Sequence, residues 1–249
     1  MEIKTKGVVL HRTFVGEKDA IIKILTEDSG VISASAKGVK GMKSKLSSGC
    51  ALFSYSDFLL SESNGRYIVT SAVLSDGFYG LSANIEKLSY ATYIAETATT
   101  LSPDAEDAKE IIPLLLNTLY LSANSNKNPR LIKCVYELRL LCLLGYAPEL
   151  DGCVSCGDTD ELCFFSISEG GAVCRSCGTI PDTQIITADT LSAMRYVKEA
   201  DLKRAFSFTL SAANIDEFEN CTERMTESIT GRRLSSLNYL KQISGLRKD

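Results

Sequence analysis

The clearest chemistry in the sequence lies in four cysteines that form two C-x-x-C pairs. Cys153 is paired with Cys156 and Cys174 with Cys177, and the 17 residues 157–173 separate the pairs. This spacing is typical of a zinc site in which four thiolates surround one metal ion as a tetrahedron. Two disulfides, or reduced cysteines with no shared role, are the alternatives. We expect one zinc ion with a structural role, because four sulfur ligands leave no open position for hydrolytic chemistry.

A short β-hairpin is expected to position these cysteines. The apolar run 162–167 is followed by a turn at 168–171 and a second short apolar run, which predicts two strands between two tight turns. Gly157 and Gly178 each follow a pair and allow such a turn without a Cβ clash. The hairpin buries too little apolar surface to be stable alone, so the metal would supply much of its local stability.

A second group of candidate residues is basic. The stretch between Asp28 and Asp57 contains no acidic residue. Glycine and serine separate its lysines, which lets these point charges follow a flexible phosphate backbone without reading the bases. The candidate DNA contacts are Lys37, Lys40, Lys43 and Lys45, with Arg12 joining them from the first turn of the barrel. The alternative is a solvated, mobile loop.

The net charge of the whole chain, −4, conceals this local excess of positive charge. Residues 1–80 contain ten Lys/Arg and eight Asp/Glu, a net charge of +2, and local fields decide encounters with phosphate. Phe14, Phe53, Tyr55 and Tyr67 are candidates for stacking on bases. Strand alternation would place Phe53 and Tyr55 on one face, where a role in the core is the more common one.

Another segment without acidic residues runs from Ser228 to Lys248. Arg232, Arg233 and Lys241 lie in it on or near a predicted helix. They are candidates for binding DNA or the acidic tail of a partner protein. The alternative is that these cations only balance the dipole at a helix end.

Catalysis finds little support in the sequence. His11 is the only histidine, and no motif around it indicates a nucleophile pair. No glycine-rich phosphate loop of the G-x-x-x-x-G-K-[ST] type occurs, so ATP hydrolysis is not indicated. No basic apolar leader and no run of about 18 apolar residues occur either, so we expect a cytoplasmic, non-enzymatic chain with no membrane contact.

The elements that position these residues change character near residue 80. Five β-rich runs, at 6–10, 20–25, 31–36, 51–60 and 67–74, predict a small closed barrel. Helical periodicity predicts a helix at 85–101, ending at Ser102-Pro103, and one at 105–122, in which Pro113 would kink the helix or move its start. A third helix is expected at 129–145 with Asn128 as its cap, and a fourth begins after a cap at Thr187 or Asp189. The last helix is expected at 215–243 with a break at Gly231. We therefore expect an α+β chain: a five-stranded barrel domain at 1–80 and a helical domain at 81–249, with the zinc hairpin inserted at 151–180.

In this order of segments the chain resembles the RecO family of bacterial recombination mediators. The resemblance covers most of the chain. It rests on residues 6–10, 16–19, 25–30, 36–39 and 44 in the first half, and on 137–141, 144–150, 153–157, 170–171 and 233–237 in the second. No single segment is specific, whereas their succession is.

The resemblance implies an OB-type barrel followed by a helical domain that carries the zinc hairpin. It implies binding of single- and double-stranded DNA, annealing of complementary strands, and action with RecR to place RecA on DNA coated with single-strand DNA-binding protein. It also implies binding of the C-terminal tail of that protein, and a cytoplasmic, nucleoid-associated location. Some relatives lack the cysteines, which favours a structural metal.

Two other functions remain open from the residues. A zinc-ribbon protein that binds RNA or the ribosome would use the same barrel and the same charges. A redox enzyme would use one C-x-x-C pair as a reactive dithiol.

Overall fold

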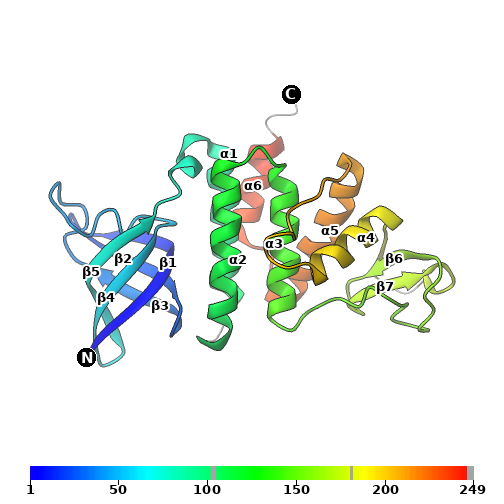
Figure 1. Ribbon diagram of the computed structural model, residues 1–249, viewed down its shortest axis with the longest axis horizontal. Helices are drawn as coiled ribbons and strands as arrows, with labels where there is room; N and C mark the ends of the chain where they lie inside the picture. The colour runs from blue at the N-terminus through cyan, green and yellow to red at the C-terminus, as the bar shows by residue number, and fades with distance from the viewer. Residues whose placement is uncertain (102–104, 180–181, 246–249) are drawn as a thin grey trace. The chain divides into compact units, whose positions relative to one another are not determined.

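The computed structural model describes residues 1–101, 105–179 and 182–245 (Figure 1). The chain forms two compact units. One unit comprises Met1–Ser125 and Leu234–Asp249, and the other comprises Asn126–Arg233. The expected domain boundary after residue 80 stays a prediction.

The first unit begins with a closed barrel of five strands. The strands are β1 (Glu2–Val15), β2 (Asp19–Thr26), β3 (Gly30–Ala36), β4 (Tyr55–Ser63) and β5 (Arg66–Asp76). Their order around the barrel is β1-β2-β3-β5-β4, and β1 closes the barrel by pairing with β4. The expected five-stranded OB-type barrel is thus confirmed.

Alternating side chains fill the barrel. Every second residue of β2 and β3 points inward, so that Ala20, Ile22, Ile32 and Ala34 are buried in one core. β1 is longer than its apolar run predicts, and its pairing with β2 shifts register between Val9 and His11. A shift of this kind bends a strand, which helps a long strand to pair with two neighbours in a closed barrel.

The expected start of the fourth strand at Ala51 is wrong. Residues 51–53 form a turn, and Phe53 adopts the left-handed conformation with φ 67°. The backbone N–H of Phe53 donates to the carbonyl oxygen of Val9 at 2.8 Å, and Phe53 is buried. Because the strand begins only at Tyr55, strand alternation does not relate Phe53 to Tyr55.

Helices complete the first unit: η1 (Tyr79–Ala83), α1 (Ile85–Leu101), α2 (Ala105–Asn124) and α6 (Ser235–Gly245). The predicted α1 is confirmed, although its expected stop signal, Ser102-Pro103, lies outside the described residues. Pro113 lies inside α2, which continues past it as one helix. Figure 1 shows α6 beside α1, against which it packs through Tyr90, Tyr93 and Leu237.

Within its described residues, the second unit contains three α-helices and a small sheet. The helices are α3 (Pro129–Leu143), α4 (Ala188–Glu199) and α5 (Ala212–Thr230). Asn128 and Thr187 cap α3 and α4 as predicted, and Gly231 ends α5 with φ 66°. The predicted break at Gly231 is therefore a complete separation of α5 from α6.

The small sheet carries the cysteines and has one more strand than predicted. Its strands are β6 (Leu162–Ser166), β7 (Gly171–Cys174) and β8 (Thr183–Ile185), in the order β7-β6-β8, and a 3-10 turn, η2 (Arg175–Cys177), follows β7. The two strands expected between the cysteine pairs are β6 and β7.

A buried ionic cluster joins α3 to α5. Lys133 is fully buried, and its Nζ lies 2.9 Å from Glu223 Oε1, 3.2 Å from Glu137 Oε2 and 3.5 Å from Glu219 Oε1. Thr222 Oγ1 donates to Glu137 Oε2 at 2.7 Å. Buried charges are tolerated only when they are paired and hydrogen-bonded in this way.

Among the described residues, none of the helices is both long enough and apolar enough to cross a membrane.

Candidate functional site

The four predicted metal ligands lie together at one end of the small sheet. The Sγ atoms of Cys153, Cys156, Cys174 and Cys177 all lie within 4.8 Å of one another, and those of Cys156 and Cys174 are 3.7 Å apart. A zinc ion at about 2.3 Å from each of four sulfurs in a tetrahedron would hold neighbouring sulfurs about 3.8 Å apart. The four thiols are therefore close enough to hold one metal ion, and the 3.7 Å separation is far longer than a disulfide bond.

Local backbone geometry brings each pair of cysteines to the metal position. The N–H of Gly157 donates to the carbonyl of Cys153 at 2.8 Å, and Gly157 adopts φ 79°, which favours glycine. Gly178 has an ordinary φ of −63° and is required for another reason. A Cβ at Gly178 would lie 2.4 Å from the ring of Phe164.

The cluster favours ionised sulfur at one ligand and opposes it at another. Burial alone would raise the pKa of Cys153, but the backbone N–H groups of Cys174, Cys156 and Ser155 lower it to about 6. At Cys156 the backbone N–H of Asp158 lowers the pKa, whereas hydrogen bonds with the three neighbouring cysteines raise it to about 12. Four thiolates would repel one another, so a bound cation is the partner that this donor set fits.

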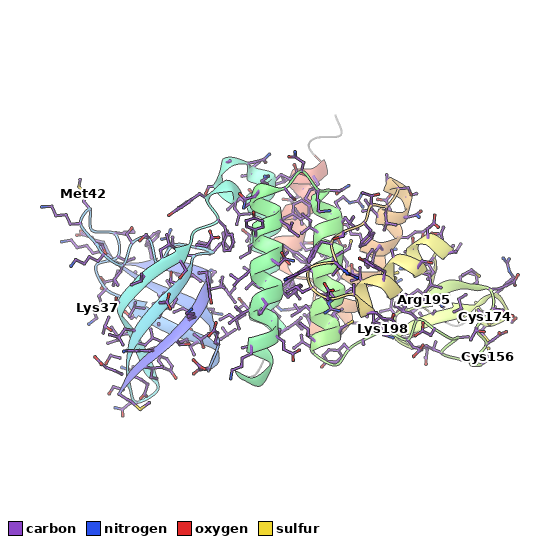
Figure 2. The ribbon with its side chains drawn as sticks, viewed as in Figure 1. Lys37, Met42, Cys156, Cys174, Arg195 and Lys198 are labelled. Carbon is purple, nitrogen blue, oxygen red and sulfur yellow. The ribbon has the colours of Figure 1, made fainter. Side chains whose placement is uncertain are left out.

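The base of the cysteine hairpin is fastened to α4. Arg195 donates from Nε and NH2 to the carbonyl oxygen of Leu150, at 2.9 and 2.6 Å. Arg195 and Lys198 both face the carboxylate of Asp151, at 3.4 and 4.0 Å. Figure 2 shows these two side chains on the part of the second unit that leads to the cysteines. Neither Arg195 nor Lys198 was predicted from the sequence as part of the site.

The predicted basic segment, residues 37–45, lies in the connection between β3 and β4 and is named here the lysine loop. Lys37, Lys40, Lys43 and Lys45 are all exposed, and none has an ion-pair partner among the described residues. The base of the loop is attached to the β1–β2 turn. The N–H of Gly38 donates to Asp19 Oδ1 at 2.7 Å.

Two further contacts hold the lysine loop on the barrel. The N–H of Lys40 donates to the carbonyl of Lys18 at 3.1 Å. Val39 is buried in the barrel core. These contacts attach the first half of the loop to the barrel.

The structure brings Arg12 and Lys40 to the same aromatic ring. Lys40 Nζ lies 4.1 Å and Arg12 Cζ 4.8 Å from the centroid of Phe14, within the range of cation–π attraction. Phe14 is 47% exposed. Of the other aromatic candidates, Tyr55 and Tyr67 are half-buried and Phe53 is buried, so Phe14 is the most exposed of the four.

An outward row of side chains crosses four strands of the barrel and was not anticipated. Thr13 pairs with Ile21, Ile21 with Ser35, and Ser35 with Ile68. Ile21 and Ile68 are exposed, so apolar and hydroxyl groups alternate along the row. Sequence alternation could have placed these residues outward, but only strand pairing puts them side by side.

The three carboxy-terminal basic candidates do not all belong to the same unit. Arg232 and Arg233 line a groove of about 360 Å³ together with Arg224 and the carboxylates of Asp182 and Glu227. Arg224 pairs with Asp182, and Arg233 Nε lies 3.2 Å from Glu227 Oε1. Lys241 lies on α6 in the other unit and does not line this groove.

Comparison with known proteins gives one consistent result. Residues 1–78 match the family model described as Recombination protein O N terminal, and residues 82–238 match Recombination protein O C terminal. A DNA repair protein RecO of Acetivibrio thermocellus is 30% identical over 248 residues, covering 98% of both chains. One from Alkaliphilus metalliredigens is 35% identical over 205 residues, covering 82% of this chain and 83% of that one. One from Halalkalibacterium halodurans is 26% identical over 244 residues, covering 98% and 96%.

Proposed function

The chain belongs to the RecO family of DNA repair proteins, and we propose that it is a non-enzymatic mediator of recombination that binds single- and double-stranded DNA. The observation that carries this proposal is the lysine loop on an OB-type barrel: its four lysines are exposed, and one of them, Lys40, lies over the Phe14 ring. Lysines that are free of carboxylate partners retain their full attraction for phosphate.

The DNA path that these residues support begins at the lysine loop. Lys37, Lys40, Lys43 and Lys45 contact successive phosphates without reading sequence. Arg12 joins Lys40 at Phe14, whose ring offers a base a stacking surface. The outward row with Ile21 and Ile68 then gives the bases an apolar face that is tolerant of sequence.

Membership of the RecO family supports a proposal about partners as well. We propose that the protein anneals complementary strands, acts with RecR, and promotes RecA loading on DNA coated with single-strand DNA-binding protein in the cytoplasm, on the nucleoid. Arg232 and Arg233 are proposed to receive DNA or the acidic tail of that coating protein. Lys241 is proposed for the same role from the other unit. Arg232 supports this assignment, because it lines the groove without a carboxylate partner among the described residues, whereas Arg224 and Arg233 are paired with Asp182 and Glu227.

The metal is proposed to be one structural zinc ion held by Cys153, Cys156, Cys174 and Cys177. Two observations support this proposal: the four Sγ atoms lie within 4.8 Å of one another, and all four ligand atoms are sulfur. Zinc would hold the two turns of the hairpin together. It would supply no open coordination position for chemistry.

A competition experiment tests the function against its main rival. Fluorescence anisotropy of a labelled single-stranded DNA is measured while unlabelled DNA or RNA of the same sequence is added. DNA is expected to displace the probe at least as well as RNA does. A clear preference for RNA would contradict the proposal and would favour a zinc-ribbon protein that binds RNA or the ribosome.

A further inference from the structure

Met42 occupies the apex of the lysine loop with its side chain fully in solvent. Its relative exposure is 105%, whereas Val39, three residues earlier, is 2% exposed. Leu46, four residues later, packs against the barrel core. Val39 within the loop and Leu46 just after it therefore anchor the loop to the barrel, whereas Met42 is directed outward, and Figure 2 shows Met42 at the end of the loop farthest from the barrel strands.

The backbone of the loop holds Met42 in this position. The N–H of Gly41 donates to the carbonyl of Gly38 at 3.1 Å, and the N–H of Ser44 donates to the carbonyl of Gly41 at 2.9 Å. These two consecutive turns share Gly41, and Met42 is an inner residue of the second one. Since Asp19 fixes the start of the first turn through Gly38, the apex is carried on a hydrogen-bonded support.

The neighbours of Met42 are cationic on both sides. Lys40 and Lys43 flank it, and both are exposed. A polymer held by these lysines must present its phosphates to them, and in a single strand the bases then project beside the phosphates toward the apex. An unbranched thioether is flexible and polarisable, so it fits between groups of varied shape.

We propose that Met42 is an apolar wedge that inserts between neighbouring bases of a single strand whose phosphates the lysine loop holds. This proposal rests on the proposed DNA binding and adds a contact that is independent of charge. In other DNA complexes apolar side chains, methionine included, insert between the base steps of a duplex and partly unstack them. The wedge would keep bound bases unstacked, a state in which they are open to pairing with a complementary strand.

An anionic lipid surface is the other ligand that an apolar tip between lysines could meet. A single apolar side chain with a few lysines gives only weak, reversible adhesion to a bilayer. The exposed Phe14 beside Lys40 favours DNA, because an aromatic ring next to a cation offers a base a second contact close to the loop.

The test compares Met42→Gln, which keeps the length of the side chain and removes its apolar character, with Met42→Leu, which keeps that character. Binding of the full chain to a single-stranded oligonucleotide with 2-aminopurine is followed by fluorescence, which rises when the base unstacks. Met42→Gln is expected to weaken binding roughly fivefold, to lose the fluorescence rise and to leave the log-salt slope unchanged. Met42→Leu is expected to stay within about twofold of the unaltered protein, and Lys43→Gln to reduce the slope instead.

Each contrary result has a distinct meaning. Equal affinity and equal fluorescence for Met42→Gln and the unaltered protein would overturn the wedge while leaving the proposed DNA binding in place. A loss confined to phosphatidylserine vesicles, with DNA binding intact, would overturn it in favour of a lipid surface. Failure of the unaltered protein to bind the oligonucleotide would overturn both the proposed function and the wedge.

Discussion

Lys40 Nζ lies 4.1 Å from the centroid of the Phe14 ring, so a lysine of the β3–β4 connection and an exposed aromatic at the end of β1 form one contact. The negative face of an aromatic ring attracts a cation. The contact places the charge of Lys40 over the exposed ring at the end of β1.

Replacement of Phe14 with leucine should weaken single-stranded DNA binding about two- to fivefold. The physical reason is the loss of a stacking surface and of a cation–π contact worth about 0.5–1 kcal/mol at an exposed site. The thermal midpoint should change little, because the ring is 47% exposed. Anisotropy titrations check the affinity. Tyr120→Leu is the matched control, since Tyr120 is an exposed aromatic on α2, and an equal loss for both variants would contradict the role of Phe14.

Removal of the metal should unfold the cysteine hairpin first. Metal analysis should find one zinc per chain, and chelation should expose the backbone amides of β6 and β7 to hydrogen exchange before those of the barrel. Cys177→Ser should act like the chelator, whereas Cys163→Ser, in the same hairpin but outside the cluster, should not.

Zinc-loaded and metal-free protein also distinguish a structural metal site from a redox-active pair of cysteines. Thiol titration should find the four ligands protected in the zinc-loaded protein. Metal-free protein with readily oxidised pairs would support a redox enzyme. Loss of DNA binding on chelation with an intact fold would contradict the structural role.

Lys133→Met should destabilise the second unit by about 3–5 kcal/mol, because it leaves the buried carboxylates of Glu137 and Glu223 without this cation. Hydrogen exchange in α3 and urea unfolding measure the loss. Lys127→Met, at an exposed position, should change stability by less than about 0.5 kcal/mol. The double variant Lys133→Met/Glu137→Leu removes one of the buried carboxylates and should recover part of the lost stability. If its free energy of unfolding is as low as that of Lys133→Met alone, unpaired buried charge is not the cause of the loss.

Glu96 should make the docking of α6 sensitive to acid. Its Oε2 accepts from the N–H of Ser236 at 2.8 Å and its Oε1 from Ser235 Oγ at 3.0 Å. Burial tends to raise the pKa of Glu96, but these hydrogen bonds outweigh it and lower the pKa. A lowered pKa stabilises the fold above the ordinary carboxyl pKa, and this stabilisation is lost as pH falls through the lowered value. After correction for the intrinsic pH dependence of exchange, the protection of the α6 amides should therefore fall in acid for the unaltered protein, and Glu96→Gln should abolish that fall.

The barrel and the cysteine cluster were predictable from sequence because their signals are local. Alternating apolar residues mark β2 and β3, and the spacing within the two C-x-x-C pairs is itself enough to predict a four-cysteine metal site. The contact of Lys40 with Phe14 was not predictable, because these residues lie far apart in sequence and meet only after β1, β2 and β3 pair, whereas Arg12 and Phe14 are alternate residues of β1. The fourth strand was predicted to start too early because phenylalanine is common in strands, whereas Phe53 adopts a left-handed conformation in a turn. The strand β8 was missed because three residues are too short to show a period.

The salt dependence of DNA binding tests the central claim most directly. Lys37, Lys40, Lys43 and Lys45 are replaced together by glutamine, and the affinity for single-stranded DNA is measured over a range of salt concentrations. If all four contact phosphates, the affinity should fall and the magnitude of the log-salt slope should decrease by about 3. Glutamine at Lys109 and Lys203, exposed lysines outside the loop, should leave the slope unchanged. A slope that is unaltered in the loop variant would contradict the assignment of the lysine loop as the DNA-binding surface.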